Sequence, residues 1–451
     1  MTISEDKMIN RRQFALRAAS TLGALAAIPA VFSDQLAAAS KLENWIDLDL
    51  ERLGAGASPE LLAKNERFWA RVRTSYVLNP SVINLDHGWT NPTPRAAVDE
   101  LVHGARRLEA LPAEELANIF FGEGNLKLHT AFAHALGVPL TEIALVRNAT
   151  EALDTVLLGF PLKDGDEIVC SAHDYFAMLD ALDQRRARDG VVLRMIRPPI
   201  PAPSLNALAE LYEAAITPRT RLVLVTHVSN LTGQLYPIQR ICAAAHKVGA
   251  EVVLDGAQAL GLHVESISDL GCDYYGASGH KWLGTPVGIG ILWMRPEHVK
   301  KIWPMVPPPP ISPEVPAMVR FEWIGTSPDY ILPAAFPALD LHRSLGPAKK
   351  AARLTYLTSY LRKRLQADLP DARFYAGTDA GMSIGITTFE LPAVSSDDLQ
   401  KRLRERYHIL TQSMAGNERT PEIRGLRVTP NVFTSLAELD RLVAAVKAIV
   451  R

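Results

Sequence analysis

The sequence predicts an α/β protein built on a mostly parallel seven-stranded sheet, followed by a smaller α+β domain. The first observation is that short apolar runs alternate with segments of helical periodicity through the middle of the chain. The second is that this alternation stops after the apolar run at 287–294, and that the C-terminal part of the chain shows capped helices and two strand-like segments instead. Helices on both faces of such a sheet explain why the runs are apolar throughout. The strand-like runs cover residues 143–146, 167–171, 191–196, 221–228, 251–254, 273–277 and 287–294.

The helices expected between these strands include residues 177–188, 205–215 and 238–248. A helix between two strands brings the chain back in the same direction, so most neighbouring strands should be parallel. The last two runs are separated by too few residues for a long crossover helix. We therefore expect the runs at 273–277 and 287–294 to form an antiparallel edge of the sheet.

The C-terminal part of the chain predicts a small domain. Ser395 with Asp398, and Ser435 with Glu438, have the spacing of helix capping boxes. The second box opens an amphipathic helix that runs almost to the end of the chain. Strand-like segments lie beside these helices, at 383–390 and 424–428.

Four segments describe the expected domain organisation. Residues 1–39 are expected to form a signal peptide, and 40–95 to pack on the small domain. The large domain should cover 96–340, and the small domain 341–451. The pocket should lie between the two domains.

Asp255 and Lys281 are the two residues whose surroundings point most directly to chemistry. Asp255 follows an apolar run, so its side chain should emerge at the carboxyl end of a buried strand, where open α/β sheets bind ligands. A buried carboxylate there can keep a pyridine nitrogen protonated, and a lysine with a lowered pKa can form a Schiff base with an aldehyde. A lone Asp or Lys is usually a solvated surface charge, but Gln258 and His280 beside them favour a site for pyridoxal 5′-phosphate.

The motifs around these residues resemble those of class V aminotransferase-fold enzymes, in the branch of isopenicillin N epimerase and the cysteine desulfurases. The resemblance extends from about Ile83 to Arg451. It implies a fold type I (aspartate aminotransferase-like) pyridoxal-phosphate enzyme, with Lys281 as catalytic residue and Asp255 as partner of the pyridine nitrogen. The motifs occur in the family's order: Asn84-Leu-Asp-His-Gly, Arg147-Asn-Ala-Thr-Glu-Ala, Thr226-His-Val-Ser-Asn-Leu-Thr-Gly, Asp255-Gly-Ala-Gln, Ser278-Gly-His-Lys-Trp and Gly425-Leu-Arg-Val-Thr-Pro.

The resemblance assigns the cofactor phosphate to four residues. Ala149 and Thr150 open a helix after a strand, and the free N–H groups and positive end of such a helix bind phosphate. From the local sequence alone, Thr150 is equally compatible with a plain N-cap. Ser278 and His280 resemble the phosphate ligands beside the lysine.

The resemblance also assigns contacts with the cofactor ring. Gln258 and Asn230 resemble the residues near its 3-oxygen, where a hydrogen bond tunes imine protonation. Tyr175 falls where the family places an aromatic or His ring over the cofactor face, which is an ordinary stacking contact. His173 is the lesser candidate for this position, and boundary packing is the alternative for Tyr175.

Arg427 and Thr326 complete the expected site. The planar guanidinium of Arg427 can hold a substrate carboxylate with two parallel hydrogen bonds, although a lone Arg is usually solvated. Thr326 follows Gly325 in a segment that resembles the one reaching the partner's phosphate across a homodimer. Gly-Thr pairs are also common in turns.

The N-terminus resembles a twin-arginine (Tat) export signal. Asn10-Arg-Arg-Gln-Phe-Ala-Leu matches the motif, an Ala-rich stretch covers 18–31, and cleavage is expected near Ala39. That stretch is shorter than the about 20 residues of a membrane span, so we expect a removable signal and no stable membrane anchor. The prediction is a periplasmic enzyme exported by the Tat machinery. The alternative is a basic tail before an amphipathic helix.

Composition narrows the class of protein. The chain has 451 residues, 48% hydrophobic content and a net charge of −1, so it can bury a large core and offers no basic surface for nucleic acid. Cys170, Cys242 and Cys272 lie in or beside apolar segments, which predicts burial and no disulfide framework. No metal-ligand spacing is present. Four consecutive prolines at 307–310 predict a rigid, extended loop near the site entrance.

Several reactions share this carbanion chemistry. A desulfurase of this branch needs a mobile Cys after the lysine, and no Cys follows Cys272. The layout resembles the exported enzymes that tailor pyoverdine-type siderophores, so we predict an aminotransferase-like enzyme acting on a small-molecule or peptide amine. An epimerase or lyase of the same family is the first alternative. A cofactor-binding protein without turnover is the second.

Overall fold

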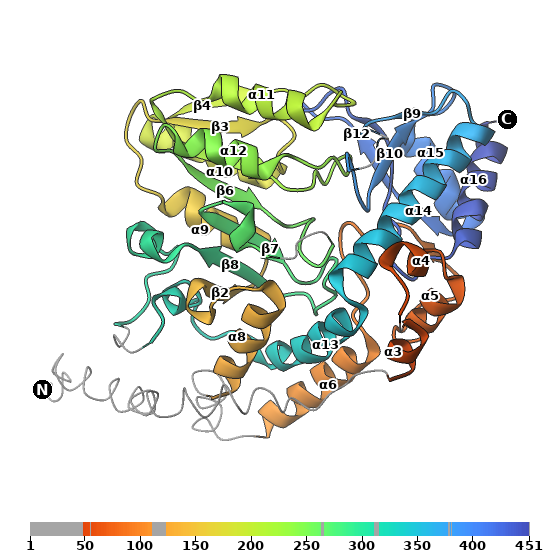
Figure 1. Cartoon of the computed structure of the whole chain (residues 1–451), viewed down its shortest axis with the longest axis horizontal. Helices are drawn as coiled ribbons and strands as arrows, with labels where there is room; N and C mark the ends of the chain where they lie inside the picture. Colours follow the sequence, from red (N-terminus) through yellow and green to blue (C-terminus); the bar gives the residue numbers. More distant parts are fainter. Residues whose placement is uncertain are drawn as a thin grey trace, which may run out of the picture.

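The computed structural model describes residues 48–54, 56–110, 123–262, 266–310, 315–377, 379 and 381–450. The predicted export signal at 1–39 lies outside these residues. Figure 1 shows two layered units, with the large sheet and its helices on one side and a smaller sheet with long helices on the other.

The seven-stranded sheet has the order β2-β8-β7-β6-β5-β3-β4 and confirms the predicted fold class. Pairing is parallel across the β7-β6-β5-β3-β4 part of the sheet. All strands except β4 are almost wholly buried, because helices cover both faces. Their bounds are β2 Ile143–Val146, β3 Glu167–Ser171, β4 Val192–Ile196, β5 Thr220–Thr226, β6 Glu251–Asp255, β7 Tyr274–Ser278 and β8 Gly290–Met294.

The antiparallel edge expected from the last two strands is only partly right. β7 and β8 are antiparallel neighbours, as their short connection requires. However, β2 pairs antiparallel with the outer side of β8, so β8 lies inside the sheet and β2 forms the edge. The spacing between β7 and β8 could not reveal this, because the pairing of β2 with β8 joins segments far apart in the sequence.

The two faces of the sheet carry different helices and separate hydrophobic cores. Helices α9 (Ala149–Gly159) and α10 (Phe176–Asp189) contribute to one core. Helices α8 (Glu123–Leu136), α11 (Leu205–Ala215) and α12 (Ile238–His246) contribute to the other. Strand β5 shows the division, because Leu222 and Leu224 enter the first core while Val223 and Val225 enter the second.

The small unit contains an antiparallel sheet with the order β12-β13-β10-β9. Both predicted N-caps form, since Ser395 Oγ accepts from the Asp398 N–H and Ser435 Oγ from the Glu438 N–H, each at 3.2 Å. The second box is reciprocal, because Glu438 Oε2 accepts from the Ser435 N–H at 2.9 Å. The bounds are β9 Arg373–Phe374, β10 Thr387–Glu390, β12 Gln412–Ala415, β13 Arg424–Val428, α14 Pro347–Asp368, α15 Ser396–Tyr407 and α16 Leu436–Val450.

The N-terminal described segment packs on the small unit through α14. Arg353 on α14 is fully buried and donates to the carbonyls of Ala63, Val432 and Thr434. These contacts tie α4 to α14 and to the loop before α16. Strand β1 pairs in parallel with β11. The bounds are α3 Leu48–Gly54, α4 Pro59–Ala63, α5 Glu66–Arg73, α6 Arg95–Glu109, β1 Ile83–Asn84, β11 Ile409–Leu410 and α13 Ala335–Leu345.

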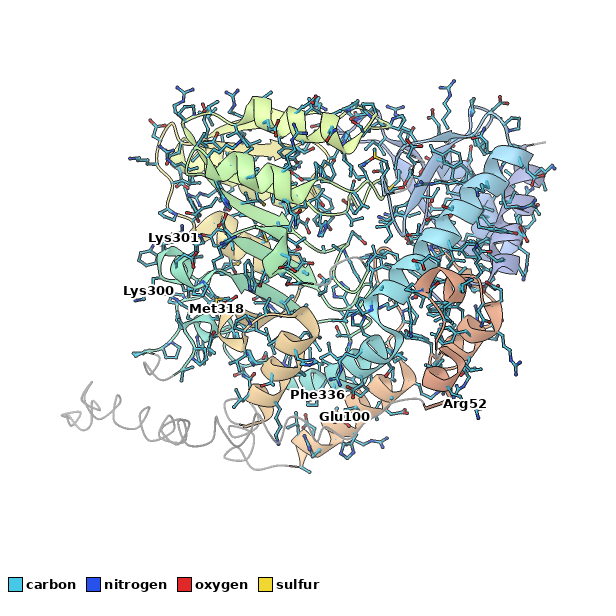
Figure 2. All side chains as sticks on the ribbon, in the orientation of Figure 1. Arg52, Glu100, Lys300, Lys301, Met318 and Phe336 are labelled. Atoms are coloured by element: carbon cyan, nitrogen blue, oxygen red, sulfur yellow. The ribbon has the colours of Figure 1, made fainter. Side chains whose placement is uncertain are left out.

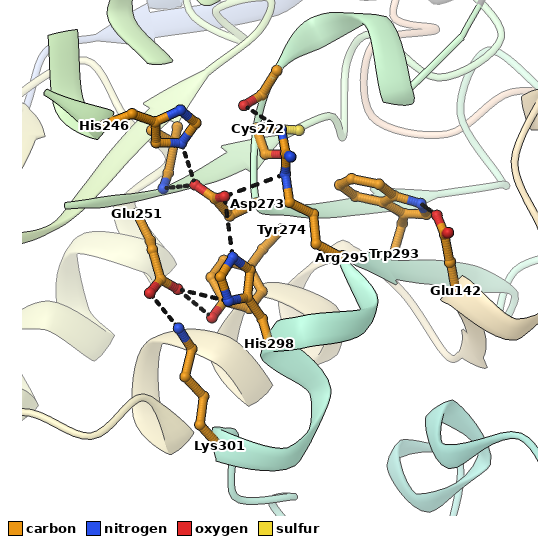
Figure 3. Close-up of polar contacts among 12 residues, drawn as sticks. Glu142, His246, Glu251, Cys272, Asp273, Tyr274, Trp293, Arg295, His298 and Lys301 are labelled. Carbon is orange, nitrogen blue, oxygen red and sulfur yellow. Dashed lines mark hydrogen bonds and ion pairs between the residues drawn. The ribbon is translucent and has the colours of Figure 1, made fainter. Parts of the chain in front are cut away.

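A buried polar network ties β6, β7 and β8 together at one end of the large sheet (Figure 3). Asp273 accepts from the Val252 N–H at 2.8 Å and contacts His246 at 2.8 Å, His298 at 3.2 Å and Arg295 at 3.3 Å. Figure 2 places the neighbouring Lys300 and Lys301 on the outer side of the large unit, away from α14. This is the end where β7 begins, opposite to the end that carries Ser278 and Lys281.

No described helix is both long and apolar enough to cross a membrane. Among the same residues, no group of three or more His, Cys, Asp or Glu side chains could hold a metal ion.

Candidate active site

Asp255 lies where the sequence pattern places it, at the carboxyl end of β6. Its side chain is only 5% exposed, and one carboxylate oxygen accepts from the Ala257 N–H at 2.9 Å. Burial raises the pKa of Asp255, while the Ala257 hydrogen bond and the charge of Lys281 lower it. Placing a cation beside Asp255 therefore offsets part of the cost of burying its charge.

Lys281 follows β7 and lies close enough to Asp255 and Arg427 for their charges to act on its amine. Burial lowers the pKa of Lys281 to about 8, against the charge of Asp255, which raises it. The charge of Arg427 lowers it further. Three of the predicted residues, which come from different parts of the sequence, thus form one electrostatic group. A substantial fraction of this lysine is the neutral amine just above neutral pH.

The start of α9 meets the end of β7 next to this group. The Ala149 N–H donates to Ser278 Oγ at 2.9 Å, and Thr150 follows in the first turn of the helix. The N-cap alternative for Thr150 is wrong, because Asn148 is the N-cap and its side chain accepts from the Glu151 N–H at 3.0 Å. Thr150 is thereby available as a donor at the helix terminus.

His280, the residue before Lys281, has a buried polar atom without a partner in the described part of the chain. Its Nδ1 is buried and has no hydrogen-bond partner among the described residues. Burial and the charge of Lys281 lower the pKa of His280 to about 4. A neutral imidazole with an unsatisfied buried nitrogen is an atom for which a ligand group would supply the partner.

Arg427 lies on β13 and is 4% exposed. It donates through Nη1 to the Asn230 carbonyl at 2.9 Å and through Nη2 to Asp86 Oδ1 at 3.1 Å. Its Nε is buried and has no partner within the described chain. Asn230 thus contacts Arg427 through its backbone carbonyl, and the side-chain role predicted for Asn230 stays a prediction.

Tyr175 sits at the N-cap position of α10 and is half-buried. Burial and the charge of Asp255 raise the pKa of its hydroxyl, and the charge of Arg427 lowers it, so its ring lies near both groups. His173, the lesser candidate, is directed to Glu422, with 3.2 Å between Nε2 and Oε1. This arrangement favours Tyr175 over His173, but Tyr175 also packs against the core that contains α9 and α10, so the stacking role stays a prediction beside the packing alternative.

Gln258 is held by two hydrogen bonds. Its Nε2 donates to the Gly88 carbonyl at 2.8 Å, and its Oε1 accepts from Trp282 Nε1 at 2.8 Å. One amide hydrogen of Nε2 is left for a further acceptor. The contact with the cofactor 3-oxygen therefore stays a prediction, with that hydrogen as the group to make it.

Thr326 lies apart from the other predicted residues. It is exposed, in the loop between the short helices Ala317–Phe321 and Asp329–Ala334. Within the described chain, no contact joins it to Lys281 or to the start of α9.

The proline-rich loop is expected near the site entrance, but the chain enters this loop far from the site residues. The Trp303 N–H donates to the Gly159 carbonyl at 3.1 Å, which is the C-terminal end of α9. The site residues meet the opposite end of that helix. Residues 311–314 of the loop lie outside the described residues.

Sequence reasoning missed Asp86, Asn91 and Lys350. Asp86 stands in a quoted motif, and its charge could have suggested a partner for Arg427. Asn91 follows the same motif and donates through Nδ2 to the Lys281 carbonyl at 2.6 Å. Lys350 gave no signal, because it lies in a helix with other basic residues, yet it donates to the Trp282 carbonyl at 2.6 Å.

The residues present fit pyridoxal 5′-phosphate. They provide an amine of lowered pKa for an aldehyde, a carboxylate for a pyridinium nitrogen and a helix N-terminus with a serine for a phosphate. The orphaned atoms His280 Nδ1 and Arg427 Nε are buried at this site and require partners. An anionic phosphate and a substrate carboxylate would supply them.

Comparisons with known proteins agree with this fit. The family model for aminotransferase class V matches residues 83–437. Isopenicillin N epimerase of Streptomyces clavuligerus is 30% identical over 401 residues, covering 84% of this chain and 98% of that protein. A probable cysteine desulfurase of Pseudomonas aeruginosa is 33% identical, but over only 48% of this chain and 55% of its own length.

Solved structures share the fold. A C-DES variant with glycine covalently linked to its PLP cofactor superposes with a TM-score of 0.75 at 22% identity, covering 83% of this chain and 98% of its own. The apo cysteine desulfurase of Thermococcus onnurineus gives 0.72 at 22% identity, covering 84% and 97%.

Proposed function

The chain belongs to the class V aminotransferase family of pyridoxal-phosphate-dependent enzymes, and on that premise we propose that it transfers the amino group of an amino acid or related amine. The observation that carries this proposal is the group of Asp255, Lys281 and Arg427. In this group, the charges of Asp255 and Arg427 shift the pKa of Lys281, and the charge of Lys281 shifts the pKa of Asp255. The three residues are suited to hold the ring nitrogen, to bind a substrate carboxylate and to accept a proton, respectively for Asp255, Arg427 and Lys281.

Each residue of the site has a defined task. When bound, pyridoxal phosphate supplies an electron sink for the bonds at the substrate's Cα. Asp255 would hold a proton on the ring nitrogen, and Ser278 with the start of α9 at Ala149 and Thr150 would bind the phosphate. Lys281 would hold the aldehyde and, once the substrate amine has displaced it, would move the Cα proton as a free amine, for which its lowered pKa is suited. Arg427 orients the substrate through its carboxylate.

Desulfuration is not supported by the thiols of this chain. Its three cysteines are all buried and free. Burial raises the pKa of each thiol, for Cys242 to about 12, so the reactive thiolate is disfavoured. None of them follows Lys281 in the sequence.

The test of transamination is a half-reaction. Purified holoenzyme is incubated with single amino donors, and the cofactor is then extracted. We expect donors with a carboxylate to leave pyridoxamine phosphate and a keto acid in equal amounts. Lys281→Ala protein serves as control and should form neither. Wild-type protein that converts no donor and shows no spectral change would contradict turnover and leave only a cofactor-binding role.

Epimerisation at Cα is a second candidate, favoured by the 30% identity with isopenicillin N epimerase across nearly that whole protein. The same residues suffice, with no keto product and no second amino acceptor. Incubation in deuterium oxide separates the two reactions. An epimerase incorporates deuterium at Cα and inverts its configuration, and the cofactor remains in the aldehyde form.

We propose a periplasmic location, supported by the twin-arginine motif before Ala39. A fusion of residues 1–39 to a reporter should be exported in cells with the Tat machinery and retained in cells without it. Retention in both would contradict the proposal. The peptide siderophore of pyoverdine type is likewise a proposed substrate, supported by layout alone, and a screen of peptide amines in the half-reaction tests it.

We also propose a homodimer, in which exposed Thr326 reaches the partner's phosphate site. Sedimentation of the purified enzyme should give twice the chain mass. A monomer with full activity would contradict this assignment for Thr326.

A further inference from the structure

The turn that carries Lys281 is held by donors from outside it. The His280 carbonyl accepts from the Asn91 backbone N–H at 2.9 Å, and the Lys281 carbonyl accepts from Asn91 Nδ2 at 2.6 Å. The Trp282 carbonyl accepts from Lys350 Nζ at 2.6 Å. Three consecutive carbonyls, from His280 to Trp282, therefore accept from two residues outside the turn, one between β1 and α6 and one on α14. Within the turn, the Gly284 N–H also donates to the Lys281 carbonyl, at 3.1 Å.

Both donors are themselves oriented by a buried partner. Asn431 Nδ2 donates to Asn91 Oδ1 at 2.7 Å, which turns the Asn91 Nδ2 group toward Lys281. Lys350 Nζ also donates to His342 Nδ1 at 3.0 Å. These four side chains are each at most 7% exposed. Buried and fully directed donors hold a backbone segment more rigidly than solvated ones do.

The charge of Lys350 is not needed for packing. Among the described residues, no carboxylate forms an ion pair with it, and its amine is buried against a carbonyl and an imidazole. Burial lowers the pKa of Lys350 to about 7. Arg353, on the same helix, is also buried but pairs with Glu66. An apolar side chain of similar length would fill the Lys350 position at lower cost in desolvation. The hydrogen bond to the Trp282 carbonyl, beside the catalytic lysine, gives a reason for an amine at this position.

We propose that Asn91 and Lys350 are positioning residues that fix the backbone of Lys281, so that its amine meets the cofactor aldehyde in the reactive geometry. The proposal rests on the proposed function for the identity of that aldehyde. The two donors and their partners come from the N-terminal segment, α13, α14 and the loop before α16. Packing between the large and small units is thereby transmitted to the turn that carries Lys281.

The test uses the full-length protein with Lys350→Met and Asn91→Ala substitutions. Lys349→Met is the matched control, because it removes the same charge one residue away and Lys349 faces Gly54 instead of the turn. Thermal unfolding first establishes that each variant is folded. Lys350→Arg, which keeps a hydrogen-bond donor, is the second variant at this position. Its hydrogen exchange and attachment rate should lie closer to those of the wild type than the values for Lys350→Met.

Two readouts are measured. Amide hydrogen exchange of residues 279–285, in protein without cofactor, reports the order of the turn through the N–H groups of Gly284 and Thr285. The second readout is the rate at which added pyridoxal phosphate becomes attached to Lys281, measured by borohydride trapping and mass analysis. This rate reports the position of the Lys281 amine. For Lys350→Met and Asn91→Ala we expect exchange about 10-fold faster and attachment about 10-fold slower, from loss of one strong hydrogen bond.

The outcomes separate the two proposals. Wild-type exchange and wild-type attachment in both variants would overturn the positioning role. An equal change in Lys349→Met would also overturn it, because the effect would then be a general one of charge. If the wild-type protein fixes no cofactor, the proposed function fails, and the exchange measurement alone decides whether Asn91 and Lys350 order the turn.

Discussion

At the scale of single residues, Lys281 shows how surrounding charges set reactivity. Burial disfavours its ammonium form, Asp255 favours it and Arg427 disfavours it, and the balance is a pKa of about 8. The two opposing charges belong to the residues that we propose for the cofactor ring and for the substrate carboxylate. On that proposal, binding and proton transfer would be coupled through the same three side chains.

The rate of cofactor attachment should rise with pH through about pH 8 in protein without cofactor, because only the neutral amine of Lys281 attacks an aldehyde. Asp255→Asn should move the midpoint to lower pH, since the carboxylate that raises the pKa of Lys281 is gone. Arg427→Gln should move it to higher pH, for the opposite reason. Trapping rates at saturating cofactor between pH 6 and pH 10, about two units either side of the midpoint, measure this. One common midpoint for all three proteins would be inconsistent with the electrostatic group.

Arg427 allows a prediction about substrate binding. Arg427→Gln should raise KM for donors with a carboxylate about 10- to 100-fold, as expected for loss of charge-assisted hydrogen bonds. Donors without a carboxylate should be affected much less. Steady-state kinetics with a matched pair, an amino acid and its decarboxylated amine, measure the difference. Equal loss with both donors would mean that Arg427 has a structural task, such as holding the Asn230 loop and Asp86.

At the scale of elements, helix ends determine much of the site and of the small domain. The start of α9 is defined by Asn148, so that Thr150 is not the cap and the Ala149 N–H is directed to Ser278 Oγ. The starts of α15 and α16 are defined by serines at the spacing that the sequence shows. Local hydrogen bonds of this kind act within a few residues, so sequence patterns predict them well.

Ser435→Ala should lower the stability of the small domain by about 1 kcal/mol, because the Glu438 N–H at the start of α16 loses its acceptor. Ser435→Asp, which keeps an acceptor, is the matched control and should retain most of the stability. Urea unfolding followed by circular dichroism compares the three proteins. Equal midpoints for Ser435→Ala and wild type would show that the Glu438 contact with Arg73 suffices to hold this end.

At the scale of the whole molecule, the large sheet has a chemical end and a structural end. Asp255, Ser278 and Lys281 emerge at the first. At the second, Asp273 accepts from the Val252 N–H of β6 and contacts His246 of α12, together with Arg295 and His298 in the segment after β8 (Figure 3). Burial alone would raise the pKa of Asp273, but the hydrogen bonds from His298, His246 and the Val252 N–H outweigh it and hold the pKa below the usual value.

This network predicts how stability falls in acid. A carboxyl group whose folded pKa is depressed stabilises the fold above its unfolded pKa of about 3.9, and that contribution is lost as pH falls through the folded pKa. Asp273→Asn should therefore lower the melting temperature at pH 7 and flatten its fall in acid. Glu213→Gln, which breaks an ion pair with Arg240 at the surface, is the control and should behave like wild type. If the melting temperatures of wild type and Asp273→Asn fall in parallel as the pH is lowered, the role of Asp273 is contradicted.

The sequence was a good guide to features with a short range. Apolar runs located all seven strands of the large sheet to within a few residues, and Asp255 was placed at a strand end because its strand is buried on both faces. Thr150 marks the limit, since Asn148 and Thr150 are both good capping residues and only the backbone decides between them. The cofactor class followed from two short motifs and their family resemblance.

By itself, the sequence determined the order of elements, the helix caps, the burial of the cysteines and the identity of the lysine and aspartate at the site. Only the tertiary structure decided that β2 closes the edge beside β8, that Asp86 meets Arg427, and that Asn91 and Lys350 hold the turn of Lys281. The physical reason is range. Periodicity and caps depend on neighbours a few residues apart, whereas these contacts join segments up to 341 residues apart, which come together only when whole elements pack.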